Sequence, residues 1–590
     1  MIPENLRSKL SPEAFSTLEV WLTDPEFSQY KEELNNLIAQ DNFVELEDRF
    51  YKHVEVGTGG IRGTLGAGPN RINLRIVGEA AQGLAEFIKD FGPEAIKKGV
   101  VVGHEARKMS EPFAKLCCEV FTANGIKTFL FAGLRATPEI SFAVRQLGAV
   151  AGVQLTASHN PRTDNGFKFY WEDGGQVVPP QDEKFMQLVK NVRAIKRLDF
   201  PDAQANGFVR IVGPEVDELY LNAIKNLSLV KSRSAKIVFS PIHGAGSTNV
   251  LPILQQERFA VAVVPEQAEP DENFPTATGD LINPEYPEVM ALPIKLGESL
   301  GADLAICSDP DADRIGVAAK KSVRANAMQF LTGNEVGVAL TAFVLEQLNK
   351  QNKLTPNSLV IETYVTSSLI SEIAKSYGIK VVDDLLVGFK YIGEIIEKLE
   401  NKNDFVFAAE ESLGYLRGSF VRDKDAAISA FTLAELASVC KDSGQTVVDY
   451  LDGIYVTHGY YKNILNMVEM RGRIGFENRD KIMTALRANP PTEFAGWPVL
   501  KIIDRLSLEK RAPTKYVCGA TGDQITFIFS DDSKTRLTAR PSGTEPKIKY
   551  YIQHQKKVAT SLASTKTEVD AVAKKIEAAI LALQEKILNS

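Results

Sequence analysis

A serine and a histidine directly after an apolar run are the first residues whose types could do chemistry. Ser158 and His159 lie in Thr156–Pro161, which follows the run Ala149–Leu155, whose length and valine content predict a buried strand. The dipeptide Asn160-Pro161 ends regular structure, so we expect Ser158 on a loop at a strand end, where open α/β sheets bind ligands. A serine hydrolase is disfavoured because there is no Gly-x-Ser-x-Gly elbow. A hydroxyl that only caps the backbone remains an alternative for this segment taken alone.

Three alternating aspartates form the second chemical signal. Asp309, Asp311 and Asp313 follow an apolar run, and their spacing in a loop lets three carboxylates converge on one hard divalent cation. A calcium EF-hand is excluded, because Arg314 and Lys320 stand where that loop needs glycine and glutamate. An aspartyl-nucleophile phosphatase is disfavoured, because Asp313 stands where its box has threonine or valine. Solvated loop acids remain the alternative. A Mg²⁺ ion held by three acids would still need a further oxygen, which we expect from a phosphate.

Two further segments have the composition of anion-binding loops. The turn Arg540–Thr544 combines a guanidinium, two hydroxyls and the free amides around a glycine, which suits a phosphate that does not react. The glycine-dense loop 56–63 contains Arg62, and its glycines let backbone amides approach an anion. It does not fit a dinucleotide fingerprint, because Arg62 replaces the third glycine and no clear strand precedes it. Both segments also fit turns that bind nothing.

The elements that must position these loops alternate between strand and helix. We expect strands over 99–103, 126–132, 149–155, 235–240, 259–264, 303–308, 358–365, 379–387 and 404–409. Helices over 110–124 and 137–147 connect the first of them, and this alternation predicts βαβ units with parallel sheets. The third group ends in the polar loop Glu410–Gly414. Each of three α/β segments therefore ends an apolar strand in a polar loop.

The C-terminal part predicts a smaller α+β domain. A hairpin over 525–529 and 535–539, a strand over 547–553 and an amphipathic helix over 567–588 follow from the pattern. We place the domains at 1–205 with the Ser158 loop, 206–325 with the aspartates, 326–450 with the Glu410 loop, and 451–590 with the Arg540 loop.

Composition limits the partners and the compartment. The 590 residues are 44% hydrophobic and 24% charged with a net charge of −7, which argues against nucleic acid or an anionic membrane as the main partner. We find no signal peptide and no apolar stretch of membrane-spanning length. The five cysteines lack metal-type spacing, so reduced thiols and a cytoplasmic protein are expected.

Taken together, the polar loops resemble the four active-site loops of the α-D-phosphohexomutases, the phosphoglucomutase/phosphomannomutase family. In chain order the loops are Thr156–Pro161, Asp309–Arg314, Glu410–Gly414 and Arg540–Thr544, and the resemblance extends to Gly57–Gly63 and Gly388–Lys390. It implies an α/β fold of three mixed-sheet α/β domains plus a C-terminal α+β domain around a central cleft, with one loop from each domain lining that cleft.

The resemblance also implies a role for each matching residue. Ser158 resembles the family's phosphoserine, and Asp309, Asp311 and Asp313, together with Ser158, resemble the ligands of one Mg²⁺ per chain. Positions associated with proton transfer and charge stabilisation match Lys168, Arg62 and His159. Residues that resemble substrate contacts are Glu410, Ser412, Gly388, Lys390, Lys424, Arg314, Arg540, Ser542, Gly543 and Thr544. Taken singly, Lys168, Arg62 and Lys390 also fit surface charges, and His159 a loop hydrogen bond.

The activity that this implies is interconversion of hexose 1-phosphate and hexose 6-phosphate. A phosphoserine enzyme would pass through a bisphosphorylated sugar, with glucose 1,6-bisphosphate as intermediate and activator. The motif Glu-Glu-Ser-Leu-Gly at 410–414 is closer to the glucose-type loop than to the Glu-Met-Ser-Gly-His form, so glucose is the first choice. Phosphomannomutase, phosphopentomutase and glucose 1,6-bisphosphate synthase activities stay open, since the chain length and residues 463–506 resemble the longer branch of the family. A sugar-phosphate binder without turnover and a metal-dependent phosphatase are alternatives from other classes. We expect a monomer or homodimer.

Overall fold

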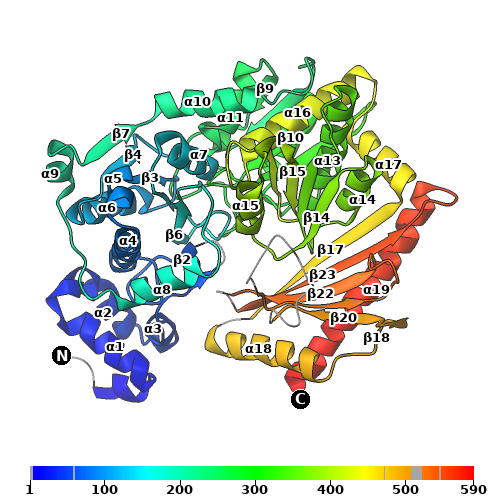
Figure 1. Ribbon diagram of the computed structural model, residues 1–590. Coiled ribbons are helices and arrows are strands. Elements are labelled where there is room, and N and C mark those ends of the chain that lie inside the picture. Colours follow the sequence, from blue (N-terminus) through cyan, green and yellow to red (C-terminus); the bar gives the residue numbers. More distant parts are fainter. Residues whose placement is uncertain (1–3, 58–59, 471, 507–520, 544–545) are drawn as a thin grey trace.

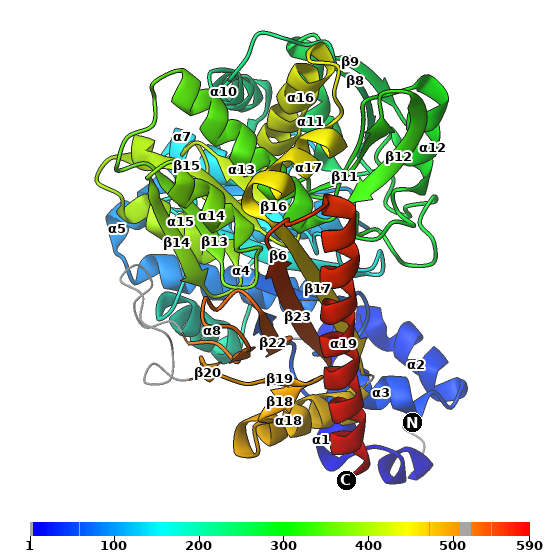
Figure 2. The ribbon, with the colours of Figure 1, turned by 90° about the vertical axis from the view of Figure 1, so that its right-hand side faces the viewer.

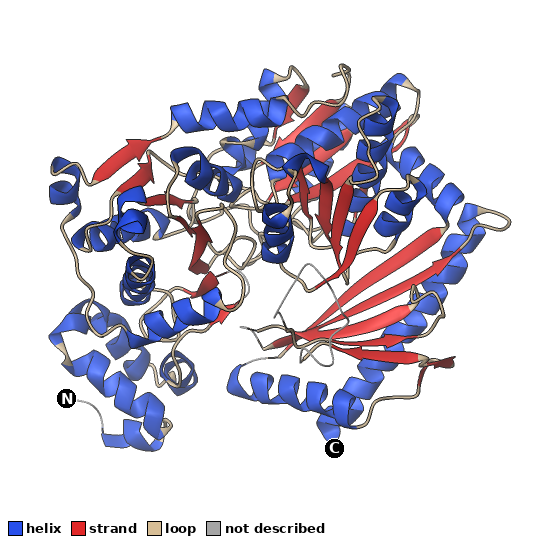
Figure 3. Cartoon of the chain, viewed as in Figure 1, coloured by secondary structure: helices blue, strands red, loops and turns tan. Residues whose placement is uncertain are grey.

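Four α/β or β-rich units follow one another along the chain in a computed structural model (Figure 1). The structure describes residues 4–57, 60–470, 472–506, 521–543 and 546–590. None of its described helices combines the length and apolar character needed to cross a bilayer. The predicted fold class is confirmed, with three mixed-sheet α/β domains followed by a β-rich domain that carries helices (Figure 3).

A helical module precedes the first sheet. Its elements are η1 (Glu4–Ser8), α1 (Pro12–Thr23), η2 (Pro25–Tyr30), α2 (Lys31–Ala39) and α3 (Phe43–Phe50). Helix α1 begins where Ser11 accepts a hydrogen bond from the Ala14 amide and where a proline occupies the first turn. The module has its own apolar core, in which the ring of Trp21 stacks on Phe27 with 4.4 Å between centroids.

The first sheet has seven strands in the order β1-β2-β6-β5-β3-β4-β7. Its strands are β1 (Val56–Gly57), β2 (Gly60–Thr64), β3 (Val100–His104), β4 (Thr128–Phe131), β5 (Ala151–Leu155), β6 (Asp164–Trp171) and β7 (Val209–Val212). Its helices are α4 (Leu74–Lys89), α5 (Pro93–Lys98), α6 (Ser110–Ala123), α7 (Thr137–Leu147), α8 (Gln181–Asn191) and α9 (Phe200–Ala205). Strands β5, β3, β4 and β7 are parallel, so β7 joins this sheet although it lies beyond residue 205. Val100 and Val102 pack in one apolar cluster and Val101 in another, because successive side chains of a strand face opposite sides.

The prediction of a plain loop over 56–63 was partly wrong, because this segment contains the short strands β1 and β2. Strand β2 pairs antiparallel with β6, placing Arg62 opposite Gly166. The glycines permit this close pairing: a Cβ at Gly60, whose φ is +101°, would lie 2.3 Å from the Phe167 carbonyl oxygen. The pairing depends on a strand about a hundred residues away, which a local pattern does not contain.

The second sheet has the order β12-β11-β10-β8-β9. Its elements are α10 (Pro214–Lys225), β8 (Lys236–Ser240), η3 (Ala245–Ser247), α11 (Val250–Gln256), β9 (Ala260–Val263), η4 (Pro265–Gln267), α12 (Ala291–Leu300), β10 (Leu304–Ser308), β11 (Ile315–Ser322) and β12 (Ala325–Leu331). Strand β10 is parallel to β8 and antiparallel to β11, so the aspartate loop joins a parallel strand to an antiparallel one.

The third sheet has the order β14-β13-β15-β16 and ends in the same way, with β15 parallel to β13 and antiparallel to β16. Its elements are α13 (Gly333–Lys350), β13 (Leu359–Thr363), α14 (Leu369–Ser376), β14 (Lys380–Leu385), α15 (Phe389–Lys398), η5 (Lys402–Asp404), β15 (Phe405–Glu410), β16 (Gly414–Arg417), α16 (Ala426–Asp442) and α17 (Val447–His458). In all three sheets, the predicted polar loop follows a strand that is parallel to one neighbour, and the strand after the loop runs antiparallel to it.

The fourth domain is an antiparallel sheet with a long helix lying along it (Figure 2). Its five strands have the order β17-β23-β22-β21-β20. Its elements are β17 (Tyr460–Glu469), α18 (Gly472–Ala488), β18 (Glu493–Phe494), β19 (Trp497–Pro498), β20 (Lys501–Asp504), β21 (Ile525–Ile528), β22 (Arg536–Pro541), β23 (Lys547–Lys556) and α19 (Leu562–Asn589). The apolar side of α19, with Ile576 and Ile580, packs into the core of this domain, as the helical periodicity predicts.

Candidate active site

Ser158 lies in a tight loop between β5 and β6. Its φ of +54° is in the left-handed region, which a residue other than glycine adopts only where its surroundings hold it. The Ser158 amide donates to the Thr156 hydroxyl at 2.7 Å. The Ser158 hydroxyl donates to Asp309 Oδ2 at 3.0 Å and lies 3.2 Å from Nδ1 of His159. The loop therefore aims one hydroxyl at a carboxylate of another domain.

A buried arginine holds the shape of this loop. Arg107, from the loop after β3, donates to the Ser158 and Asn160 carbonyls at 2.6 Å each. It also donates to the carbonyls of Pro161 at 2.6 Å and Asp164 at 2.9 Å. Its Nε donates to Glu105 at 2.9 Å, and both side chains are fully buried. The planar guanidinium thus ties four carbonyl oxygens of one loop to a single rigid group.

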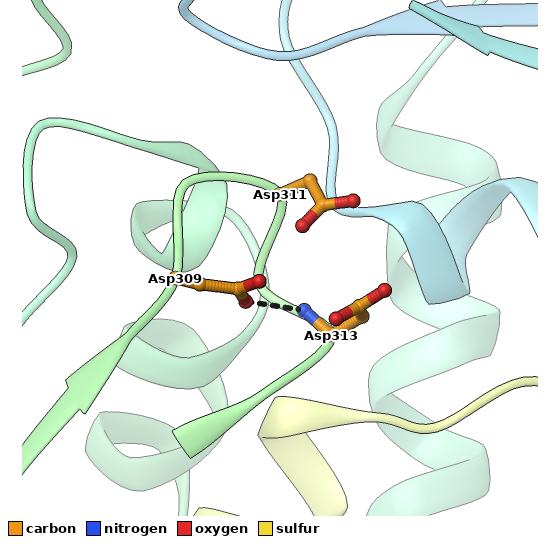
Figure 4. Close-up of side chains that lie close together, drawn as sticks. All are labelled: Asp309, Asp311 and Asp313. Carbon is orange, nitrogen blue, oxygen red and sulfur yellow. Dashed lines mark hydrogen bonds between the residues drawn. The ribbon is translucent and has the colours of Figure 1, made fainter. Parts of the chain in front are cut away.

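The three aspartates converge in the loop between β10 and β11 (Figure 4). One carboxylate oxygen from each of Asp309, Asp311 and Asp313 lies within 4.8 Å of the others, and all three side chains are fully buried. Asp309 Oδ1 accepts hydrogen bonds from the amides of Asp313 and Arg314. The cluster is therefore held by its own backbone as well as by neighbouring charges.

Two lysines from other domains balance part of this negative charge. Lys168, on β6, lies 2.6 Å from Asp311 Oδ2 and 3.0 Å from Asp313 Oδ2, and Lys424 lies 2.9 Å from Asp313 Oδ2. Burial would raise the pKa of Asp311, but Lys168 outweighs it and the pKa is lowered. For Asp309, burial and then the carboxylates of Asp313 and Asp311 raise the pKa well above its usual range. Carboxylates this close together in a buried site repel one another, so the site favours binding of an additional positive charge.

The residues present fit a metal ion. The Oδ1 atoms of Asp311 and Asp313 are buried and accept no hydrogen bond from the described residues. Orphaned carboxylate oxygens beside a third carboxylate form the all-oxygen donor set that hard divalent cations prefer. The buried triad can therefore hold a metal ion.

A third loop brings a carboxylate to the cleft from β15. Glu410 is buried, and its Oε1 accepts a hydrogen bond from the Gly388 amide at 3.0 Å, which joins two predicted segments. Burial raises the pKa of Glu410 to about 7, against the opposing charge of Lys424. Arg314 donates to the Ser412 carbonyl at 3.0 Å, so the aspartate loop and this loop are in direct contact.

The fourth loop contributes positive charge. Arg540, Ser542 and Gly543 line the cleft at the end of β22, and Thr544 lies outside the described residues. Lys547 and Lys549 of β23 line the same cleft. They share a face because their spacing of two matches the strand period, a signal that sequence reasoning could have used.

These loops enclose one polar cleft with a volume of about 600 Å³. Sequence-predicted residues on its lining are Arg62, His159, Arg314, Gly388, Glu410, Ser412, Lys424, Arg540, Ser542 and Gly543. Ser158, Lys168 and the three aspartates are buried behind this lining: Ser158 contacts His159, Asp313 contacts Arg314 and Lys424, and Lys168 pairs with Asp311 and Asp313. Residues from all four domains therefore meet around one site.

Family models for phosphoglucomutase/phosphomannomutase α/β/α domains I, II and III match residues 53–196, 218–322 and 332–457. Phosphoglucomutase from Staphylococcus aureus (strain N315) is 31% identical over 541 residues, covering 90% of this chain and 95% of the relative. That from Staphylococcus saprophyticus is 34% identical over 506 residues, covering 84% and 89%.

The chain belongs to the phosphoglucomutase/phosphomannomutase family.

Solved structures of the family share its fold. A phosphoglucomutase/phosphomannomutase family protein from Burkholderia thailandensis has a TM-score of 0.62 at 16% identity, covering 88% of this chain and 97% of the other. The open form of the Paramecium phosphoprotein parafusin, a phosphoglucomutase, has a TM-score of 0.64 at 17% identity, covering 91% and 96%. The predicted family is confirmed, and so is the coarse activity: the chain is a phosphohexomutase, an isomerase.

Within this family site, one predicted substrate contact, Lys390, has another partner, and so has Arg422 beside the predicted contact Lys424. Lys390 does not line the cleft and pairs with Asp182 of the first domain at 3.0 Å. Arg422, from the run that also contains Lys424, pairs with Glu397 at 2.8 Å. Both pairs join separate elements, and neither is a surface charge: the Lys390 side chain is 7% exposed and the Arg422 side chain is fully buried.

Sequence reasoning missed Glu105 and Arg107, which shape the Ser158 loop. The available signal was a pair of opposite charges directly after the apolar run that forms β3. Burial raises the pKa of Glu105 to about 7, and Arg107 opposes that rise. For His159, burial followed by the charges of Arg314 and Arg62 lowers the pKa well below its usual range, so its imidazole is neutral near pH 7.

Proposed function

We propose that this phosphohexomutase interconverts glucose 1-phosphate and glucose 6-phosphate through a phosphorylated Ser158. The observation that carries the proposal is the 3.0 Å contact between the Ser158 hydroxyl and Asp309 across two domains, beside a cleft of about 600 Å³. Glucose is supported by the Glu-Glu-Ser-Leu-Gly loop and by relatives named phosphoglucomutase.

Substrate binding divides along the cleft. Arg540, Ser542 and Gly543 hold the phosphate that does not react, because a guanidinium can bind two phosphate oxygens at once and Ser542 brings a hydroxyl to the same wall of the cleft. Glu410 and Ser412 exchange hydrogen bonds with the sugar hydroxyls. A sugar that is held by its ring hydroxyls and by one phosphate presents its free hydroxyl to Ser158.

The reaction is a transfer of one phosphoryl group in each direction. The free sugar hydroxyl attacks the phosphorus of phosphorylated Ser158, a new O–P bond forms, and the bond from phosphorus to Ser158 Oγ breaks. The bisphosphate then turns in the cleft, and its other phosphate returns to Ser158 by the reverse step. Lys168, Arg62 and His159 are the groups that stabilise the transferring oxygens or exchange the hydroxyl proton. Fixed charges in a dry site make positioning and electrostatics the main sources of rate.

Asp309, Asp311 and Asp313, with an oxygen of phosphorylated Ser158, would hold one Mg²⁺ ion that neutralises charge on the transferring group. Glucose 1,6-bisphosphate would serve as intermediate and activator. A cytoplasmic location is supported by the cysteines of the described residues, at positions 117, 118, 307 and 440, which are free and buried.

The test combines intact-mass measurement with turnover of three sugars. We expect a labile phosphate on Ser158 and faster conversion of glucose 1-phosphate than of mannose 1-phosphate or ribose 1-phosphate. Ser158→Ala abolishes turnover and leaves the melting temperature near that of wild type, because the hydroxyl donates a single hydrogen bond. Retained turnover in Ser158→Ala, or preference for another sugar, contradicts the corresponding part. Net release of free phosphate would indicate a phosphatase instead.

A further inference from the structure

The helical module at residues 4–52 contributes to the wall of the cleft, although the matched family domains begin only at residue 53. Asp48, Tyr51 and Lys52, at the end of α3, line the cleft together with Phe476 and Met470 of the fourth domain. Figure 1 shows α18 extending from the fourth domain towards α3. The cleft is thus bounded on this side by two elements from opposite ends of the chain.

The module is fixed to the first domain by buried arginines. Arg49 of α3 lies 2.7 Å from Glu45 and donates to the Ala67 carbonyl at 3.2 Å. Arg71 of the first domain lies 2.9 Å from Glu45 and 2.8 Å from Asp48. Because these charged groups are mostly buried and multiply paired, the module moves with the first domain.

The side chain of Lys52 joins this module to the fourth domain. Lys52 Nζ lies 4.3 Å from the ring centroid of Phe476 on α18, within the range of a cation–π contact, and 3.4 Å from Glu55. The guanidinium of Arg479 lies 5.0 Å from the same ring. Arg479 also donates to the Ser542 carbonyl at 2.5 Å. A continuous set of contacts therefore leads from the module to the loop proposed to hold the phosphate that does not react.

We propose that Lys52 and Phe476 form a latch that keeps the fourth domain closed over the cleft while the bisphosphate turns. The inference rests on the proposed function, since only a mutase needs to retain a bisphosphate between two half-reactions. Lys52 and Phe476 are positioning residues that act through Arg479 on the Ser542 loop. Breaking their contact loosens the mouth of the cleft without touching Ser158 or the aspartates.

The test uses Lys52→Met and Phe476→Leu, which keep apolar bulk and remove the cation or the ring. Each variant is expected to release glucose 1,6-bisphosphate about two- to thirtyfold more often per turnover, the factor that a cation–π contact commonly carries. Single-turnover phosphoryl transfer from Ser158, measured on the same variants, changes by a smaller factor than the release of bisphosphate. The double variant releases no more than Phe476→Leu alone, because Lys52 acts only through the ring that this substitution removes. The matched control is Lys97→Met, at an exposed lysine that pairs with the exposed Glu94.

Unchanged release in both single variants, or additive effects in the double variant, overturns the latch. A second measurement separates this result from a failure of the proposed function. If the wild-type chain converts no hexose phosphate, the proposed function fails and small-angle scattering of the free proteins decides on the latch. Lys52→Met must then have a larger radius of gyration than wild type and Lys97→Met, and an equal radius refutes the contact as a closing device.

Discussion

Arg107 offers the sharpest test of how the Ser158 loop is held. The substitution Arg107→Met removes five donated hydrogen bonds: four to carbonyls of the loop and one to Glu105. Breaking a buried ion pair by removing one partner commonly costs about 3–5 kcal/mol. Glu105 can partly relieve that cost by taking up a proton, because its pKa is already raised to about 7. We therefore expect a loss of stability at the lower end, about 3 kcal/mol in urea unfolding.

The larger effect should be on kcat. Ser158 has a φ of +54°, and the Arg107 bonds to the Ser158 and Asn160 carbonyls help to hold that conformation. A displacement of the reacting group by about 1 Å can cost a hundredfold in rate, so kcat is expected to fall about a hundredfold while KM changes little. The residual activity is measured with glucose 1-phosphate at saturating glucose 1,6-bisphosphate.

Two comparisons make the Arg107 prediction refutable. Arg107→Lys keeps one charge beside Glu105 but lacks the planar fork, so it should recover most of the stability and little of the rate. Arg197→Lys is the matched control, because Arg197 is half exposed and pairs with Glu119 at the surface. Wild-type kcat in Arg107→Met, or full recovery of rate by Arg107→Lys, would show that the loop keeps its shape without the guanidinium.

Further predictions concern the metal, the sugar loop and the buried lysine. Chelation with EDTA should abolish turnover and leave the circular dichroism unchanged, and Mg²⁺ should restore activity; full activity in EDTA contradicts a metal at Asp309, Asp311 and Asp313. For Glu410, burial raises the pKa in the folded state from 4.5 to about 7. Between these pH values the unfolded chain has lost a proton that the folded chain keeps, so the stability of the folded state falls as pH rises. A shift of that size corresponds to about 3 kcal/mol at most, so Glu410→Gln should flatten the decline in urea midpoint between pH 4.5 and pH 7; an unchanged slope contradicts the burial argument. Lys168→Met leaves the aspartates with less positive charge, and it should reduce kcat at least about a hundredfold; a change in KM alone would indicate a binding role instead.

The chain by itself determined where the chemical loops begin. Apolar runs of five to seven residues followed by Asn-Pro, Asp-x-Asp or Glu-Glu-Ser locate strand ends, because burial and turn chemistry act on neighbouring residues. The spacing of Asp309, Asp311 and Asp313 likewise sets their convergence, since all three lie in one short loop. Helix α7 has the predicted bounds, Thr137–Leu147, because Pro138 and Gly148 mark its two ends.

Only the tertiary structure decided which distant side chains face one another. Lys168 reaches Asp311 across 143 residues, and Lys52 reaches Phe476 from the opposite end of the chain. Lys390 resembles a substrate contact in the sequence, but it pairs with Asp182 of the first domain and does not line the cleft. Periodicity reports which face of an element is buried, and it contains no information on which other element will cover that face. Which charges pair between domains depends on how the sheets pack, so the partners of these lysines and arginines follow only from the tertiary structure.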